Sequence, residues 1–305
     1  MTYVSFPGFG IEPFHMDRIA FSLFGVNVNW YGLIITCGMI LAVLYALWHA
    51  KFERVKTDDI IDLALFLIVA GVIGARLYYV IMEFDQYLVT NGTFWKNLTG
   101  TLYNIIAVWN GGLAIYGGII AGFLTAIVVA RKKRIRFSVI ADLAGPAVMV
   151  GQIIGRWGNF VNVEAYGAET TLPWRMGILY SFDGAASFVS EKFVHPTFLY
   201  ESLWNLVGLI LITYLYKKKK FHGQMFLTYM TWYGFGRMLI EGLRTDSLYI
   251  GSIRVSQMVG LVTFVVGMIL LIWNFRKAKM RASLADDAST PDEEDREVKK
   301  DGSNH

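Results

Sequence analysis

Three long stretches of this sequence contain no charged side chain, and they restrict the fold more than any other feature. No Asp, Glu, Lys or Arg occurs between Arg18 and Lys51, between Lys96 and Arg131, or between Arg254 and Arg276. Each stretch exceeds the ~20 apolar residues that a helix needs to cross a hydrocarbon core of about 30 Å. The sequence therefore predicts an integral membrane protein and excludes a water-soluble domain.

Seven segments fit the length and composition of membrane-spanning helices. We expect them near Val28–Trp48, Ile60–Met82, Gly111–Ala130, Phe137–Trp157, Pro196–Tyr216, Gly223–Gly242 and Val255–Phe275. The predicted fold class is an all-α integral membrane protein, with residues 1–283 forming a seven-helix transmembrane domain. Residues 158–195, between spans four and five, are expected to form a small extracytoplasmic segment. The acidic, polar residues 284–305 are expected to be a disordered cytoplasmic tail.

The segments that connect these spans alternate in charge. Sixteen Lys or Arg fall in His49–Asp59, Arg131–Arg136, Lys217–His222 and Arg276–Arg281. Only five fall in the N-terminus to Asn27, Phe84–Asn110, Gly158–His195 and Leu243–Gly251. Because cytoplasmic loops are enriched in Lys and Arg, we expect the N-terminus outside and the C-terminus in the cytoplasm. The net charge of +4 arises from these clusters and indicates no nucleic-acid partner.

Ionisable side chains interrupt the predicted spans at Arg76, Arg156, Arg237 and Glu241. Such residues are costly in a membrane and mark a functional site by default. Counted from the cytoplasmic ends at ~1.5 Å per residue, the three arginines all fall in the outer half of the membrane. Arg237 and Glu241 are four residues apart, so we expect them to pair on one helix face. A purely structural, snorkelling role is the alternative for Arg76.

Arg156 and Arg237 lie among glycines, in GQIIGRWGNF and WYGFGRMLIEG, which allow a ligand or another backbone to come close. The planar guanidinium group can donate two hydrogen bonds to one phosphate. Arginines at outer-leaflet depth therefore predict a site for a lipid phosphate. Further polar residues are expected at the same level: Tyr31, Tyr116, Asn159, Asn162, Glu164 and His195. For His195, which precedes a proline at a helix start, a capping or packing role is an equal alternative.

The stretch GRWGNFVNVEAYG, Gly155–Gly167, resembles the signature of the prolipoprotein diacylglyceryl transferase family. Other segments resemble the family in the same order along the chain. They are NWYG at Asn29–Gly32, GARLYYV at Gly74–Val80, WNGGLAIYGG at Trp109–Gly118, HPTFLYE at His195–Glu201 and YGFGRMLIEGLRTD at Tyr233–Asp246. The resemblance thus extends from the first predicted span almost to the last.

This resemblance implies an enzyme of the bacterial cytoplasmic membrane that uses no metal or organic cofactor. Its expected partners are phosphatidylglycerol and the lipobox, or signal helix, of a preprolipoprotein. The lipobox cysteine thiol would receive the diacylglyceryl group as a thioether, with release of glycerol 1-phosphate, as the first step of lipoprotein maturation. The resemblance assigns phosphatidylglycerol binding to Arg156, and importance to Tyr31, Asn159, Glu164, Gly167, Arg237 and Glu241.

The sequence departs from part of the family at Tyr116. In that part of the family, a histidine precedes the two glycines of the third motif and is proposed as a catalytic base. In this sequence the same position is Tyr116. The phenol has a reference pKa of about 10, so unaided it is a poor base near neutral pH. Three alternatives stay open: nearby arginines activate Tyr116, Tyr116 only orients the thiol or phosphate, or the base is His195 or Glu201.

We hypothesise that Arg156 and Arg237 hold the phosphate, that Glu164 and Glu241 orient them, and that Asn159, Tyr31 and Tyr116 complete the polar wall. A non-enzymatic lipid or anion carrier is the leading alternative from another class. A carrier needs polar groups in the cytoplasmic half too, where only Asp62 and Asp142 lie near the ends of spans. A seven-span receptor is a third possibility, but it offers no use for arginines flanked by glycines.

Overall fold

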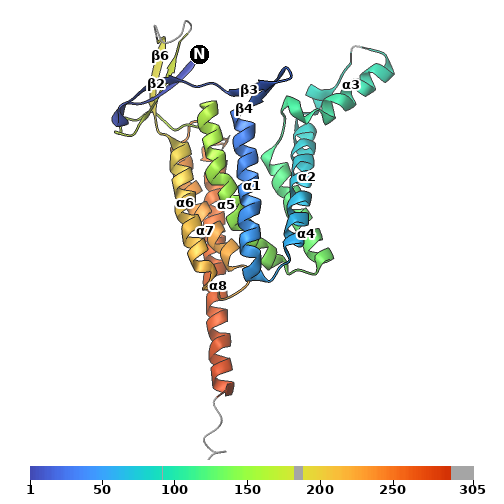
Figure 1. Ribbon diagram of the computed structural model, residues 1–305, viewed down its shortest axis with the longest axis vertical. Helices are drawn as coiled ribbons and strands as arrows, with labels where there is room; N and C mark the ends of the chain where they lie inside the picture. The colour runs from blue at the N-terminus through green and yellow to red at the C-terminus, as the bar shows by residue number, and fades with distance from the viewer. Residues whose placement is uncertain (91, 182–187, 290–305) are drawn as a thin grey trace, which may run out of the picture. The chain divides into compact units, whose positions relative to one another are not determined.

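Figure 1 shows the computed structural model of the protein, which describes residues 1–90, 92–181 and 188–289. Most of these residues are helical. The long helices among them are α1 (Trp30–Glu53), α2 (Thr57–Met82), α4 (Ile115–Lys133), α5 (Phe137–Asn162), α6 (Thr197–Tyr216), α7 (Gln224–Glu241) and α8 (Val255–Ser289). Within the described ranges, six of them, all except α7, are long and apolar enough to cross a membrane.

The prediction of a mostly helical integral membrane protein is therefore confirmed, and each of the seven predicted segments overlaps one of these helices. Helices are the expected solution, because backbone groups in lipid find no water and must bond within their own segment. Helix α8 runs on to Ser289, so the first residues of the expected tail at 284–305 are helical. The remainder of that tail lies outside the described residues.

The chain forms two compact units. Unit 1 comprises Met1–Tyr31 and the described part of Arg156–His305, and unit 2 comprises Gly32–Gly155. The division passes through helices α1 and α5, and each unit has its own packing.

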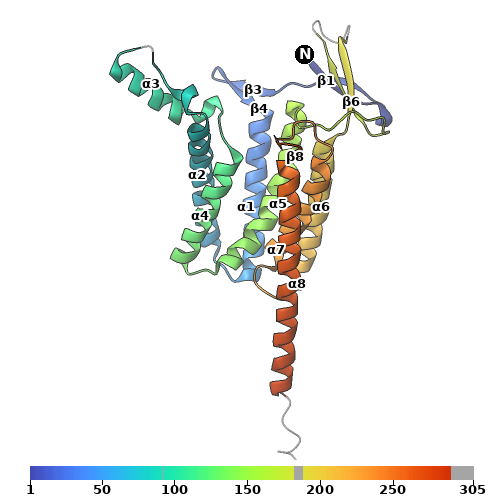
Figure 2. The same ribbon diagram turned by 180° about the vertical axis from the view of Figure 1, so that it is seen from behind.

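In unit 2, helices α2 and α4 run side by side (Figures 1 and 2). Their backbones approach closely because a glycine from each helix lies at the crossing. A Cβ atom on Gly117 would overlap the carbonyl oxygen of Gly74. At the other end of the pair, Leu63, Val129, Ala130 and Ile140 form a buried cluster. Three short helices connect α2 to α4: η2 (Phe84–Tyr87), α3 (Phe94–Ile106) and η3 (Val108–Asn110).

Unit 1 carries an antiparallel sheet that the sequence analysis did not predict. Its order is β2 (Ile11–His15), β1 (Thr2–Phe6), β5 (Met176–Tyr180) and β6 (Ser190–Val194). The N-terminal strand β1 thus pairs with the segment between α5 and α6, with Val4 opposite Ile178. The inner side chains of the sheet pack onto Phe198 at the start of α6. This packing fixes the segment that precedes α6.

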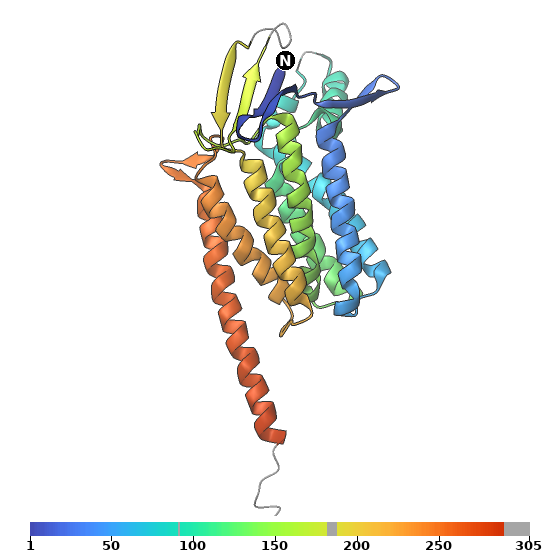
Figure 3. The same ribbon diagram turned by 60° about the vertical axis from the view of Figure 1, so that its left-hand side comes forward.

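The helices of unit 1 pack in the order α6, α7, α8, with α7 in contact with both neighbours. Gly234 of α7 meets Gly260 of α8, where a Cβ on either would crowd the backbone of the other helix. Helix α8 extends beyond the ends of α6 and α7 (Figure 3). Two hairpins complete the unit: β3 (Ile19–Leu23) with β4 (Val26–Asn29), and β7 (Tyr249–Ile250) with β8 (Ile253–Arg254).

Candidate active site

Two stacked tryptophans join α6 to α7 in unit 1. The indole N–H of Trp204 donates to the carbonyl oxygen of Trp232 at 3.0 Å, and that of Trp232 donates to the carbonyl of Trp204 at 2.8 Å. The rings stack with their centroids 4.5 Å apart. Gly208 and Gly236 make room for them, since a Cβ on either would overlap an indole ring. The two helices therefore face each other in one fixed register.

Near the Trp204–Trp232 pair, the carboxylate of Glu201 in α6 contacts three arginines. Its Oε2 lies 2.6 Å from Nη2 of Arg156 in α5. Its Oε1 lies 3.2 Å from Nη1 of Arg237 in α7 and 3.4 Å from Nη1 of Arg244, which follows α7. Only 4% of Glu201 is exposed. A buried carboxylate needs such partners, because burial otherwise strongly disfavours its charge.

Glu241 is the second buried carboxylate of this network. Its Oε2 lies 2.7 Å from Nη2 of Arg237, so the pair expected from their four-residue spacing is present. The same oxygen lies 3.9 Å from Nε of Arg244. Arg254 of β8 donates to the main-chain carbonyl of Glu241 at 2.5 Å and so holds the end of α7.

Arg244 also binds Asp246, a half-exposed residue at the edge of the network. Its Nε and Nη2 donate to the two carboxylate oxygens at 3.0 and 2.8 Å. These hydrogen bonds hold the pKa of the Asp246 carboxyl below its usual range, so it is ionised at neutral pH. The network thus contains three guanidinium groups and three carboxylates. Glu201 and Glu241 are buried, whereas the arginine side chains are 11–19% exposed. The guanidinium groups are therefore more accessible to an anion than these two carboxylates are.

The signature stretch extends this network through hydrogen bonds. Nη1 of Arg156 donates to Oδ1 of Asn159 at 3.2 Å, and Nδ2 of Asn159 donates to Glu164 at 2.8 Å. Asn162 also donates to Glu164, at 3.4 Å. Glu164 thus reaches Arg156 through Asn159, whereas Glu201 is the carboxylate that pairs with Arg156 directly.

The backbone after α5 folds sharply to bring Glu164 back toward the helix. Its N–H donates to the carbonyl of Asn159 at 3.0 Å. Val163 and Ala165 adopt φ angles of +51° and +57°. A positive φ is unfavourable for a β-branched residue, and such strain is concentrated at functional sites. The ring of Tyr31, at the start of α1, packs against Gly158 of α5, where a Cβ would lie 2.9 Å from the ring.

Gly167 lies where three segments meet. Its N–H donates to the carbonyl of His195, and the next N–H, of Ala168, donates to the carbonyl of Leu243. A Cβ on Gly167 would lie 2.7 Å from Cβ of His195 and 3.0 Å from the Leu243 carbonyl oxygen. No larger residue fits without moving backbone, so Gly167 holds the segment of Arg244 beside the start of α6.

His195 is tied to aromatic side chains. The indole N–H of Trp174 donates to the Tyr200 hydroxyl at 2.7 Å, and that hydroxyl lies 3.2 Å from Nδ1 of His195. Since the hydroxyl oxygen already accepts from Trp174, its own proton is available to Nδ1. Burial lowers the pKa of His195, so the imidazole is neutral at pH 7.

Tyr116 and Arg76 belong to unit 2. Tyr116 occupies the first turn of α4 and is 46% exposed. Arg76 is buried, and its guanidinium donates to the carbonyl oxygens of Asn104, Ile105, Ala107, Gly111 and Gly112 and to the hydroxyl of Tyr87. Its donors are thus saturated by the chain itself, and the structural alternative for Arg76 fits the geometry.

The comparisons with known proteins agree on one family. The family model described as prolipoprotein diacylglyceryl transferase matches residues 18–273. The chain is 46% identical to a phosphatidylglycerol–prolipoprotein diacylglyceryl transferase of Finegoldia magna, over 84% of this chain and 95% of the relative. Enzymes of that name from Listeria welshimeri and Clostridioides difficile are 43% and 41% identical, over 90% and 88% of this chain and 94% and 99% of each relative.

The chain belongs to the prolipoprotein diacylglyceryl transferase family. The resemblance drawn from the sequence motifs is therefore confirmed.

The sequence analysis missed Arg244 and gave Glu201 only a secondary place as a candidate base. One signal for Arg244 was available. Arg237, Glu241 and Arg244 follow the spacing i, i+4, i+7, which puts three ionisable groups on one helical face. No local pattern marks Glu201 as their common partner, because that contact joins separate helices.

We predict that Glu201→Gln destabilises the folded protein. The change leaves three guanidinium groups without their shared counter-charge, and removing one partner of a buried ion pair costs about 3–5 kcal/mol. Thermal unfolding in detergent should show a clear fall in the midpoint. The matched control Glu191→Gln alters an exposed carboxylate of β6 and should leave the midpoint unchanged. Equal midpoints for both variants would contradict the network's structural role.

Proposed function

We propose that the protein transfers the diacylglyceryl group of phosphatidylglycerol to the cysteine thiol of a preprolipoprotein lipobox. The observation that supports this most is the cluster of Arg156, Arg237 and Arg244, whose partly exposed guanidinium groups are held by the buried carboxylates of Glu201 and Glu241. Such a site in a membrane protein favours an anionic lipid head group. The named activity of the relatives supplies the reaction.

We infer that α7 is the seventh span and that the network lies in its outer half. The basic segments after α6 and within α8 fit the cytoplasmic side. Helix α8 crosses the membrane before it reaches its own basic residues. Its basic end therefore lies on the same side as the segment after α6 only if α7 also crosses the membrane. With this orientation the N-terminal sheet is extracytoplasmic, and the enzyme is a multi-pass protein of the bacterial cytoplasmic membrane.

In the proposed complex Arg156 and Arg237 bind the phosphate of the lipid. Among the described residues, one N–H of Nη1 and one of Nη2 on Arg156 have partners, which leaves Nε–H and the second N–H of each Nη available for a two-pronged contact. Glu201 and Glu241 hold the arginines in place, so little conformational entropy is lost when the lipid binds. Asn159, held between Arg156 and Glu164, donates the second N–H of its amide to the same phosphate in this proposal. Gly167 and Tyr31 keep the backbone around Arg156 and Arg244 in the conformation that the site needs.

The proposed reaction forms one bond and breaks one. The cysteine sulfur, as a thiolate, attacks the carbon of the diacylglyceryl group that carries the phosphate and forms a C–S bond. The bond between that carbon and the phosphate oxygen breaks, and its electron pair stays on the oxygen. Glycerol 1-phosphate leaves, and the thiol proton is taken up by a base or by the departing phosphate. The arginines stabilise the charge that develops on the leaving oxygen.

A free cysteine, with a pKa near 8.5, is only a few per cent ionised at pH 7, so the thiolate must be favoured. We propose that the positive field of the arginines lowers the pKa of the bound substrate thiol. Tyr116 then orients the thiol or phosphate by a hydrogen bond and removes no proton. His195, neutral and bound to Tyr200, is the alternative base.

Purified protein mixed with phosphatidylglycerol and a lipobox peptide tests the activity directly. A transferase adds the mass of one diacylglyceryl group to the peptide and releases glycerol 1-phosphate in equal amount. A lipid carrier with the same arginine pocket binds phosphatidylglycerol but leaves the peptide mass unchanged. That second result would overturn the proposal.

We predict that Arg156→Lys lowers the transfer rate roughly ten- to a hundredfold. Lysine keeps the charge but loses the planar fork, and small misplacements of a reacting group have effects of this size. The transfer rate to the lipobox peptide is the measurement. Arg175→Lys, which alters an arginine stacked on Phe193 in unit 1, is the matched control and should retain the parent rate. Full activity of Arg156→Lys would exclude a two-pronged phosphate contact.

We predict that Tyr116→Phe slows transfer about tenfold without changing the shape of the pH–rate profile. Loss of one orienting hydrogen bond accounts for a factor of this size. Transfer rates from pH 6 to 9 should still rise with ionisation of the substrate thiol in both proteins. If the alkaline rise disappears in Tyr116→Phe, the phenol is the base and the orienting role is wrong.

A further inference from the structure

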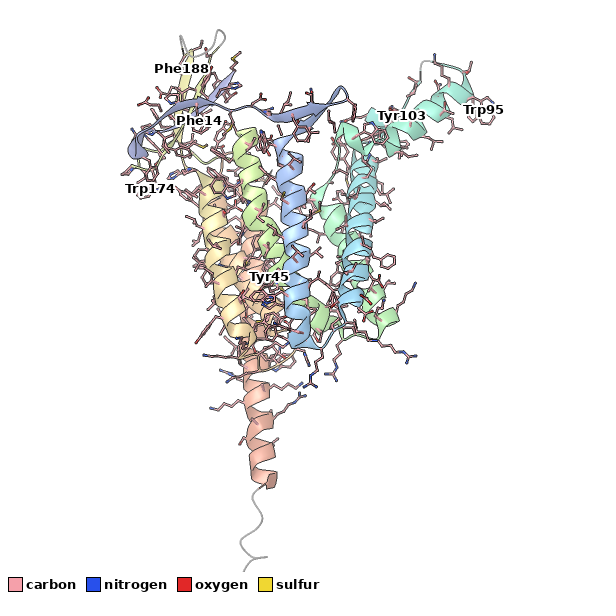
Figure 4. The ribbon with its side chains drawn as sticks, in the orientation of Figure 1. Phe14, Tyr45, Trp95, Tyr103, Trp174 and Phe188 are labelled. Atoms are coloured by element: carbon pink, nitrogen blue, oxygen red, sulfur yellow. The ribbon has the colours of Figure 1, made fainter. Side chains whose placement is uncertain are left out.

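Helix α3 (Phe94–Ile106) in unit 2 turns its large apolar side chains away from the protein. Five of them are exposed: Phe94 at 72%, Trp95 at 71%, Leu98 at 39%, Leu102 at 48% and Ile106 at 65%. Phe94, Leu98, Leu102 and Ile106 follow one another at intervals of four residues, and Trp95 lies three residues before Leu98, so all five lie on one side of the helix. Figure 4 shows Trp95 and Tyr103 projecting from α3.

The opposite side of α3 is small and polar, and it is this side that packs on the chain. Gly100 lies against Val89, where a Cβ would come within 3.1 Å of the valine side chain. The hydroxyl of Thr101 accepts the N–H of Val89 at 3.0 Å, and the amide of Asn104 donates to the carbonyl of Tyr87 at 3.4 Å. The helix is therefore reversed relative to one in water, which buries its apolar face.

The buried Arg76 of α2 holds the C-terminal end of α3. Its Nε donates to the carbonyl of Ile105 at 2.9 Å, and its Nη2 donates to those of Asn104 and Ala107 at 2.6 and 3.2 Å. These are the carbonyls that a helix end leaves without partners, and a cation is favoured beside them. The outward direction of the apolar face is thus fixed by α2 itself.

Helix α3 also lies at the right level to meet lipid. It connects the end of α2 at Met82 to the start of α4 at Ile115, and both are apolar enough to span a membrane. In Figures 1 and 2 it leaves that end of the α2–α4 pair and runs sideways. Aromatic residues such as Trp95 and Tyr103 are enriched at the membrane–water interface.

We propose that α3 is an interfacial helix whose apolar face lies in the lipid leaflet at the end of α2, held there by Arg76. Interfacial helices insert their apolar face roughly 5–10 Å below the level of the head groups. The lipid surface is the occupant because the helix adjoins two spans and exposes a continuous apolar face. This role needs membrane insertion of α2 and α4 but does not depend on the transferase reaction.

Spin labels on the full-length protein test this proposal. The native Cys37 is replaced by Ala, and a nitroxide is attached in turn to Leu102→Cys and Lys96→Cys. Both sites are exposed, and six residues place them on different sides of the helix. The protein is placed in nanodiscs of phosphatidylglycerol and phosphatidylcholine. Collisions with oxygen, which concentrates in lipid, and with a water-soluble nickel chelate are then measured.

We expect the label at residue 102 to collide mainly with oxygen and the label at residue 96 to collide mainly with the nickel chelate. Equal access of the chelate to both labels would show that α3 lies in water and would overturn the proposal. Protection of the label at 102 from both reagents would also overturn it. In that case a protein surface, such as a second copy of the chain, covers the helix.

Discussion

The buried carboxylate of Glu201 is the interaction on which the site depends. It joins Arg156, Arg237 and Arg244, and so connects α5, α6, α7 and the segment that follows α7. Three guanidinium groups would repel one another in a site of low dielectric constant, and one shared carboxylate holds them together. The carboxylates of Glu201 and Glu241 lie deeper than the guanidinium groups, so the arginines are the more accessible part of this pairing. We propose the phosphate clamp on that basis.

The surrounding packing serves to place these charges. The stacked Trp204 and Trp232 set the register of α6 on α7, while Gly167 lets three segments meet beside Arg244. Arg76 provides the contrast. Its donors are occupied by main-chain carbonyls, so it fixes α3 and has no capacity for a ligand. Arg76 and the network arginines thus differ in role according to whether main-chain carbonyls occupy all of their donors.

Much of the helical architecture was predictable, because lipid permits few alternatives to a long apolar helix. The pairing of Arg237 with Glu241 was also predictable, since it depends on local spacing. The pairing of strand β1 with β5 and the position of Glu201 were not, because both join residues distant in sequence. The reversed helix α3 was missed because its residues fall in Phe84–Asn110, which the sequence analysis treated only as a segment that connects two spans. The role of Tyr116, which lies in the other unit, stays a prediction.

The distance between the lipid phosphorus and the arginine side chains tests the central claim most directly. Protein with ¹⁵N-labelled arginine, in bilayers of phosphatidylglycerol, is suited to solid-state NMR measurement of phosphorus–nitrogen couplings. A guanidinium hydrogen-bonded to phosphate places nitrogen and phosphorus ~4 Å apart. We expect such a coupling in the parent protein and its loss when Arg156 and Arg237 are both replaced by glutamine. A parent spectrum without the coupling, from protein with transfer activity, would contradict the proposed phosphate clamp.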